Sequence, residues 1–271
     1  MTLRLLAVHA HPDDESSKGA ATLARYAAEG VDVLVATCTG GERGDVLNPT
    51  LDREDVRRDL PAIRRREMAD AARILGIRHT FLGHEDSGLT EPSPAGSFAA
   101  LPLPEATKPL LDLMREFRPQ VVVTYDETGG YPHPDHIRTH EVTTVAFAES
   151  DDGTPRKLYY LATLSRSWFE AMHEATLAAG QESMMCPVLE ELPPADVLTV
   201  TTRIRCEDHF ATRDAALRAH ATQMDPGHPF FAHSREIERK AWPWEDYHLA
   251  RTNGPVEIGG GLEDDLFAGL R

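Results

Sequence analysis

Short apolar runs alternate with longer amphipathic segments through the first half of this chain, and this alternation constrains the fold more than any other feature. Runs rich in aliphatic and β-branched residues predict strands at 3–9, 31–38, 77–83 and 120–126. Segments with apolar residues at helical spacing predict helices at 16–30, 53–75 and 105–119. The order predicts an α/β fold: a Rossmann-like, doubly wound, mostly parallel sheet with helices on both faces.

The pattern weakens after residue 150. Strands are predicted at 157–164 and 197–204 and a helix at 206–224, whereas the prolines and tryptophans beyond Asp225 predict an irregular C-terminal extension lying against the main body. The Pro/Gly/Ser-rich stretch at about 86–104 predicts a long surface loop. Because no internal repeat or low-complexity linker interrupts the chain, we expect one domain over 1–271, with a core at about 1–165 and an elaboration at about 166–271 that helps to shape the pocket.

The charge balance and the cysteine content exclude several classes of protein. With 28 Lys and Arg against 44 Asp and Glu, the net charge is −16, so nucleic acids and anionic membranes are poor partners. Solubility explains this acidity more simply than the steering of a cationic substrate would. The three cysteines show no CxxC spacing, and the first residues carry too few apolar side chains for a signal peptide or membrane span. We therefore expect a cytoplasmic protein.

A cluster of metal-ligand residue types, His11-Pro12-Asp13-Asp14-Glu15, follows the first predicted strand. Open α/β sheets bind ligands at the carboxyl ends of their strands, and imidazole and carboxylate groups are good zinc ligands. The three-residue step from His11 to Asp14 lets both side chains turn toward one point. Asp13 then stays free as a plausible general base for a metal-bound water.

A second cluster, His133-Pro134-Asp135-His136, follows the predicted strand at 120–126. In the commonest doubly wound order the first and fourth strands are neighbours, so both clusters would face one crevice and supply three protein ligands with a position left for water. Either cluster alone could consist of turn and helix-capping residues. His140 lies four residues after His136 on a predicted helix, which leaves open a rival ligand set in which it replaces Asp14.

Several motifs together carry a family resemblance. AHPDDE (10–15), RRREMADAARILG (64–76), DSG (86–88) and HPDH (133–136) resemble the LmbE/PIG-L superfamily of zinc-dependent N-deacetylases and amidases. Within it, the group of amidases that act on mycothiol S-conjugates is similar in HPDDESSKGAAT (11–22), GGERGD (40–45), TYDETGGYPHPDHIRTHE (124–141), HATQMDP (220–226) and WPWEDYHLAR (242–251). The similarity is weakest between about 150 and 200.

The resemblance implies a role for each matching residue. His11, Asp14 and His136 would be the zinc ligands and Asp13 the general base. His133 would stabilise the oxyanion as a cation or protonate the leaving amine, Asp135 would orient it, and Tyr131 would be a second oxyanion donor. Beside a carboxylate, His133 is also suited to remain charged near neutral pH.

The resemblance also implies residues that contact substrate. Lys18 would face it, although a solvated lysine at a helix start is the alternative. Arg64, rather than Arg65 or Arg66, and Asp86 would hold sugar hydroxyls. His220, inside HATQMDP, would line the pocket. Separately from the resemblance, the glycines at 40, 41 and 44 predict a tight loop beside the metal from which Glu42 or Arg43 would point toward the substrate.

The expected function is hydrolysis of the amide that joins an S-substituted N-acetylcysteine to glucosaminyl-inositol, in detoxification or in natural-product biosynthesis. One alternative is an N-deacetylase of an N-acetylglucosamine derivative such as N-acetylglucosaminyl-inositol, and another is a metal-binding partner protein without turnover. Zn²⁺ is the expected cofactor, with Fe²⁺ as the alternative because two histidines and one aspartate accept either ion. The expected partner is a small thiol–sugar conjugate, and an oligomer is compatible with the sequence.

Overall fold

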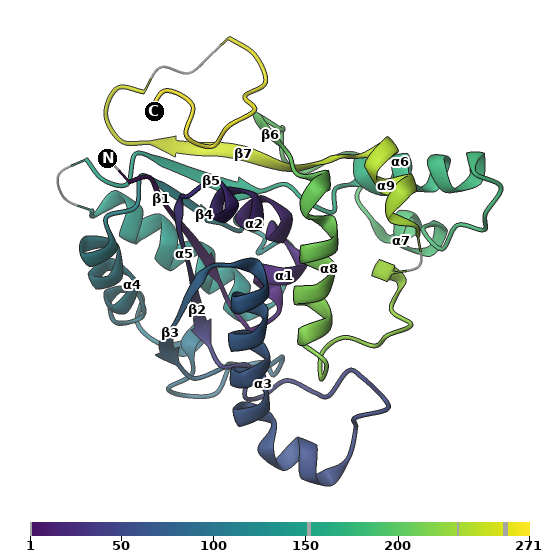
Figure 1. The fold of residues 1–271 in the computed structure, drawn as a ribbon. Helices are drawn as coiled ribbons and strands as arrows, with labels where there is room; N and C mark the ends of the chain where they lie inside the picture. The colour runs from purple at the N-terminus through teal and green to yellow at the C-terminus, as the bar shows by residue number, and fades with distance from the viewer. Residues whose placement is uncertain (1, 151–152, 232, 257–259) are drawn as a thin grey trace.

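The computed structural model describes residues 2–150, 153–231, 233–256 and 260–271. It contains a seven-stranded sheet covered by helices (Figure 1). The strands are β1 (Arg4–His9), β2 (Asp32–Thr39), β3 (Arg78–His84), β4 (Val121–Thr124), β5 (Lys157–Leu161), β6 (Thr202–Arg205) and β7 (Trp244–Thr252). Their order in the sheet is β3-β2-β1-β4-β5-β7-β6.

The first five strands run parallel, and the predicted neighbourhood of the first and fourth strands is confirmed. Leu6 of β1 aligns with Leu34 of β2 on one side and with Val122 of β4 on the other. Such strands are buried on both faces, which explains why they are near-continuous apolar runs in the sequence. The carboxyl ends of β1 and β4 therefore open at the same edge of the sheet.

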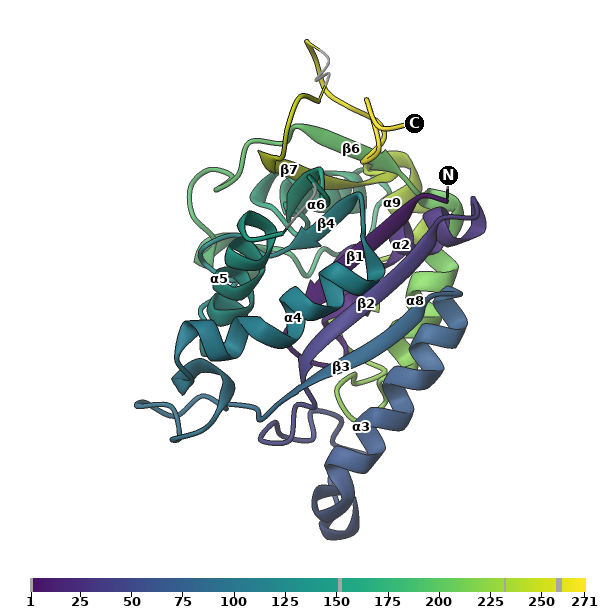
Figure 2. The same cartoon turned by 90° about the vertical axis from the view of Figure 1, so that its left-hand side faces the viewer.

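Helices connect these strands and cover both faces. The α-helices are α1 (Asp14–Ser17), α2 (Ala20–Ala28), α3 (Glu54–Leu75), α4 (Leu103–Phe117), α5 (Pro134–Ala148), α6 (Arg166–Ala178), α7 (Cys186–Glu191), α8 (Phe210–Ala219) and α9 (Arg235–Ala241). Short 3₁₀ turns are η1 (Phe98–Ala100), η2 (Glu207–His209) and η3 (Pro229–Phe231). Figure 2 shows α4 and α5 on one side of the parallel strands and α3 and α8 on the other.

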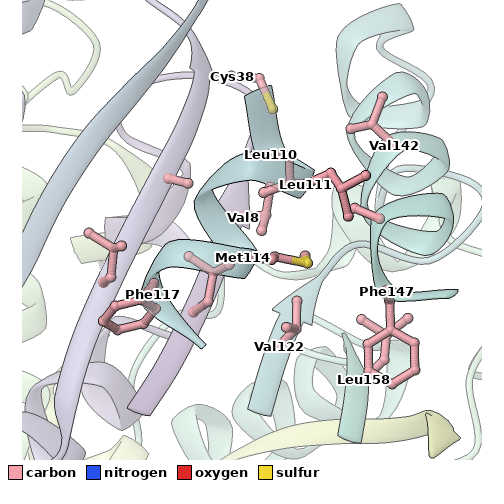
Figure 3. Packing of buried hydrophobic residues seen from close by; sticks show 14 of the residues in the cluster. Val8, Cys38, Leu110, Leu111, Met114, Phe117, Val122, Val142, Phe147 and Leu158 are labelled. Atoms are coloured by element: carbon pink, nitrogen blue, oxygen red, sulfur yellow. The ribbon is translucent and has the colours of Figure 1, made fainter. Parts of the chain in front are cut away.

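The two-residue period of the strands divides the core into two layers. Leu6 and Val8 of β1 pack with Leu110 and Met114 of α4 in one layer (Figure 3). Their neighbours in the strand, Leu5 and Ala7, belong to the layer that includes residues of α2 and α3. The predicted α/β class, with helices on both faces, is confirmed.

The C-terminal extension is more regular than predicted. It contains α9 and the long strand β7, which pairs antiparallel with β5 on one side and with β6 on the other. The prediction of an irregular extension is therefore wrong at these residues, because the Trp and Pro cluster at 242–244 lies at the start of a strand and does not mark a loop. Positions 232 and 257–259 of that extension lie outside the described residues.

Element bounds differ from the predictions in smaller ways. The predicted helix at 16–30 is divided into α1 and α2 at Lys18 and Gly19, whose φ angles are −136° and +87°. The predicted strand at 197–204 is shortened to Thr202–Arg205. The predicted loop at 86–104 gives way to η1 and to the first turn of α4. Across the described residues, the structure contains no helix with the length and apolarity needed to span a membrane.

Candidate active site

The two predicted clusters meet at the carboxyl edge of the sheet. His11 and Asp13 occupy the turn between β1 and α1, whose first residue is Asp14. His133 caps α5 by accepting a hydrogen bond at Nδ1 from the backbone N–H of Asp135. Because β1 and β4 are adjacent, the turn after β1 and the start of α5 converge on one point.

His11, Asp14 and His136 place their ligand atoms within 4.8 Å of one another. Asp14 Oδ2 lies 3.3 Å from His136 Nε2 and 3.6 Å from His11 Nδ1. Tetrahedral zinc with bonds of about 2.0–2.1 Å holds its ligand atoms about 3.3 Å apart, so this spacing fits. His136 Nε2 is buried and has no hydrogen-bond partner among the described residues, as a nitrogen reserved for a metal would be.

The remaining atoms of these ligands are held by the protein. His11 Nε2 contacts Asp135 Oδ2 at 3.3 Å, and His136 Nδ1 contacts the carbonyl of Gly129 at 3.0 Å. Lys18 Nζ donates to Asp14 Oδ1 at 3.0 Å. Partners of this kind fix the tautomer and the orientation of ligating imidazoles, so the residues present fit a divalent metal.

Two other sets of residues could in principle hold the metal. The ligand atoms of His11, Asp86 and His133 also lie within 4.8 Å of one another. In that set Asp86 Oδ1 faces His11 Nε2 at 3.6 Å, and this nitrogen already lies 3.3 Å from Asp135 Oδ2, which makes the set less suited. His140 belongs to neither group, and its Nδ1 lies 3.1 Å from the carbonyl oxygen of Tyr125, so the structure does not support the rival set in which it replaces Asp14.

Asp13 lies beside the ligand group without joining it. Its φ of 108° is unusual for a residue with a side chain, and its carboxylate is about one quarter exposed. Burial raises the pKa of the Asp13 carboxyl, while Arg64, with Nη2 3.4 Å from Oδ2, opposes the rise. A partly accessible carboxylate beside a metal group is placed as a general base requires.

His133 and Asp135 are arranged differently from the prediction. The Asp135 carboxylate contacts His11 and the backbone N–H of Ser87, and only the backbone N–H of Asp135 orients the His133 ring. Burial, followed by the nearby imidazoles of His11 and His136, lowers the pKa of His133 to about 4. Burial, the largest cause, and the two imidazoles thus act against the predicted charge on His133, while the Asp135 carboxylate favours it.

Two of the predicted substrate residues, Arg64 and Asp86, lie close to the predicted metal ligands. Arg64 is buried and donates to the carbonyls of Pro12 and Gly41, whereas Arg65 lies over the Phe81 ring, so Arg64 is the arginine at the site. Asp86 Oδ1 lies 3.6 Å from His11 Nε2.

The glycine loop after β2 contacts Asp86 through two residues. Glu42 accepts a hydrogen bond from the Asp86 backbone, and the Arg43 backbone N–H donates to Asp86 Oδ2.

Tyr131 stands at the mouth of the site. Its side chain is 47% exposed, and its ring centroid lies 4.4 Å from that of His136. Lys18 Nζ is 5.8 Å from the centre of the same ring, so the lysine faces the site and not bulk solvent alone. Both residues are within the region where a substrate bound at the ligands would lie.

His220 lies beneath the site, and the prediction that it lines the pocket is wrong. The side chain is completely buried and its Nε2 contacts Glu15 Oε1 at 2.8 Å. Glu15, also fully buried, accepts a hydrogen bond from the backbone N–H of Asp13 through Oε2. Glu15 was missed as a site residue, although it directly follows the predicted cluster and an acid in an apolar setting needs a partner.

The comparison with protein families decides the chain's membership. Residues 6–147, more than half of the chain, match the model of the PIG-L family, described as GlcNAc-PI de-N-acetylase. The chain belongs to the PIG-L family. The matched range begins in β1 and ends in α5, so it contains both ligand clusters.

Relatives extend the PIG-L similarity over the full length. A mycothiol S-conjugate amidase from Streptomyces coelicolor is 48% identical over 99% of this chain and 98% of its own length. A 1D-myo-inositol 2-acetamido-2-deoxy-alpha-D-glucopyranoside deacetylase from Acidothermus cellulolyticus is 42% identical over 100% of this chain and 96% of its own. Both relatives are hydrolases of amide bonds.

Solved structures confirm the fold. N,N'-diacetylchitobiose deacetylase from Pyrococcus horikoshii superposes with a TM-score of 0.61 and 19% identity, covering 91% of this chain and 83% of that one. The zinc-inhibited form of a teicoplanin deacetylase gives a TM-score of 0.59 at 19% identity, covering 90% and 96%.

Proposed function

We propose that this protein hydrolyses the amide between an S-substituted N-acetylcysteine and glucosaminyl-inositol, using a divalent metal held by His11, Asp14 and His136. The single observation that carries the proposal is the buried group of His11, Asp14 and His136 with a further, partly exposed carboxylate, Asp13, beside it. The substrate follows from the 48% identity to a mycothiol S-conjugate amidase along the whole chain. We propose zinc as the native metal and iron(II) as the alternative.

The chemistry divides between the metal and the side chains around it. A zinc ion held there supplies Lewis acidity to the amide carbonyl and lowers the pKa of water toward about 7. Asp13 accepts the proton of the attacking water and passes it to the leaving nitrogen. The hydroxyl of Tyr131 and the ring of His133 lie on the α5 side, where they can donate to the carbonyl oxygen as negative charge develops on it.

The surroundings suit a small polar conjugate. Glu42, Arg43 and Asp86 form a hydrogen-bonded group beside His11, and their side chains offer contacts to sugar hydroxyls. We place the reaction in the cytoplasm, because Cys38, Cys186 and Cys206 are all free.

A purified-enzyme assay tests the function. Protein loaded with zinc, and separately with iron(II), is incubated with the bimane S-conjugate of mycothiol and with N-acetylglucosaminyl-inositol. Release of the N-acetylcysteine conjugate from the first substrate supports the amidase. Release of acetate from the second alone would establish the deacetylase, which the 42% identity to an inositol-glycoside deacetylase favours as the second candidate.

Asp13→Asn separates an enzyme from a metal-binding partner protein. Because the amide cannot accept the proton of the attacking water, kcat should fall about 10²–10⁴-fold, while the bound metal per chain stays unchanged. Metal content is measured on the same preparation. Undiminished turnover in this variant would remove Asp13 from the mechanism.

A further inference from the structure

A groove opens beside the metal centre, between the start of α5 and two segments that follow β5. One wall carries Tyr131, Pro132 and Ile137, and the other is formed by 161–166 and 192–198. The volume of this open groove is about 410 Å³, within the range of small-molecule sites.

The side chains that line this groove are mainly apolar. They include Tyr131, Ile137, Leu161, Leu164, Val197 and Leu198. Tyr131 and Val197 are 47% and 63% exposed, so the apolar surface is open to a ligand and not closed upon itself. Exposed apolar concavity of this size on a soluble protein marks a binding site.

The outer wall is held in place by the polar residues of the groove. Asp196 accepts hydrogen bonds from the backbone N–H and the hydroxyl of Ser167, and Arg166 donates to the carbonyls of Leu192 and Pro193. Leu164 is held at a φ of 56°, a conformation that bulky residues rarely adopt. These groups are engaged with the protein, so the groove presents apolar surface in a fixed shape.

Tyr131 links the groove to the predicted metal ligands. The ring of Tyr131, which lines the groove, lies 4.4 Å from the ring of the ligand His136. The predicted ligand His11 instead faces Asp86, which does not line the groove, at 3.6 Å. An amide bound between His11 and His136 therefore has polar groups toward one end and an apolar groove toward the other.

We propose that the groove binds the apolar substituent on the sulfur of the acyl part, while the polar side around Asp86 receives the sugar. This inference rests on the proposed amidase function and names how the same site selects its substrate. Both segments of the outer wall, 161–166 and 192–198, lie outside the range 6–147 that matches the family model. The outer wall of the groove thus comes from a part of the chain beyond the family match, whereas Tyr131, Pro132 and Ile137 of the inner wall lie within it.

Val197→Asp tests the groove, because the exposed side chain can be replaced without disturbing the core. The wild type should show a KM about tenfold lower for the bimane conjugate than for an S-methyl conjugate of mycothiol. Val197→Asp should raise the KM for the bimane conjugate about tenfold and leave kcat and the S-methyl KM unchanged. Leu177→Asp, at a 52% exposed apolar residue of α6 away from the groove, is the matched control.

Equal changes for the two conjugates, or no change for either, would overturn the proposal. If the wild type cleaves neither conjugate, the amidase function fails, and the groove is then judged by titration with the S-bimane derivative of N-acetylcysteine. Weaker binding to Val197→Asp than to Leu177→Asp supports the groove in that case, and equal binding refutes it.

Discussion

At the scale of single residues, the position of the predicted ligand His136 depends on the absence of a side chain at Gly129. Its φ is +74°, and a Cβ placed there would lie 2.7 Å from His136 Cβ and 3.1 Å from the carbonyl carbon of the same residue. The close approach lets the Gly129 carbonyl reach His136 Nδ1. Glycine is therefore required by both the backbone angle and the space.

Gly129→Ala should weaken zinc binding about 10–100-fold, because the methyl group displaces His136 and its hydrogen-bond partner. Gly130→Ala is the matched control, since Gly130 has nearly the same φ, +73°, but nothing within 4 Å of an added Cβ. Competitive chelator titration of both variants measures the affinity. Equal losses of zinc affinity in the two variants would show that backbone strain alone causes the effect.

The buried pair of Glu15 and His220 holds the backbone at Asp13. His220 contacts one oxygen of Glu15, whose other oxygen accepts the Asp13 N–H and so stabilises its positive φ. Neither side chain reaches substrate, since both are completely buried. We infer that they are positioning residues for the general base.

His220→Ala should lower kcat about 10–100-fold with KM and bound metal unchanged, because Asp13 loses its orientation while the ligands keep theirs. His220→Gln, which keeps an N–H donor, should recover most of kcat. Steady-state kinetics and metal analysis distinguish this outcome from a structural defect, which would lower the metal content of His220→Ala.

At the scale of elements, a buried ionic cluster joins α9 to α8. Arg213 of α8 donates to both oxygens of Glu238 in α9, and Arg235 of α9 contacts Asp214 of α8. Although burial raises the pKa of Glu238, its contacts with Arg213 and His233 outweigh this and hold it below its ordinary value. Ionised Glu238 therefore stabilises the folded state.

The sign of the pH dependence follows from the lowered pKa. The stabilisation is complete above the ordinary value of 4.5 and is lost as the pH falls toward the folded-state pKa. Glu238→Gln should cost about 3 kcal/mol of unfolding free energy at pH 7, and less at each step below about pH 4. Urea unfolding at several pH values measures the difference, with the exposed Glu236→Gln on the same helix as a control that should change little. A difference independent of pH would contradict the ionic origin.

At the scale of the whole molecule, the C-terminal segment contacts both β5 and α2 at the end of the sheet opposite the predicted metal ligands. Lys157, the first residue of β5, is completely buried, and its Nζ contacts Glu263 at 3.1 Å. Asp265 accepts a hydrogen bond from Tyr26 of α2 at 2.8 Å. Figure 1 shows this yellow segment above β7, and Glu263 forms a bridge with Thr202 of β6. These contacts thus lie at the edge of the sheet opposite the proposed active site.

Glu263→Ala should lower the free energy of unfolding by about 3–5 kcal/mol, because the ammonium group of Lys157 stays buried without its carboxylate. Zinc affinity should be unchanged, since the metal ligands follow the carboxyl ends of β1 and β4. Denaturant unfolding and chelator titration measure the two quantities, and Asp264→Ala, at the exposed neighbouring acid, is the control. A loss of zinc affinity in the folded variant would show that the two edges are coupled.

Much of the fold could be predicted from the sequence because its signals are local. The apolar runs at β1, β2 and β4 and the amphipathic periods of α3 and α4 reflect which face each segment buries. The antiparallel strand β7 could not be predicted from the sequence, because its pairing with β5 and β6 depends on residues about 40 to 95 positions away in the chain.

The sequence by itself determined the predicted ligand set. His11, Asp14 and His136 follow the first and fourth strands, which the α/β order makes neighbours. Only the tertiary structure decided what surrounds them. Burial and the imidazoles of His11 and His136 lower the pKa of His133, Asp135 turns toward His11, and His220 lies beneath the site. Burial and electrostatic contacts depend on every element packed around a group, and no local pattern of residues contains that information.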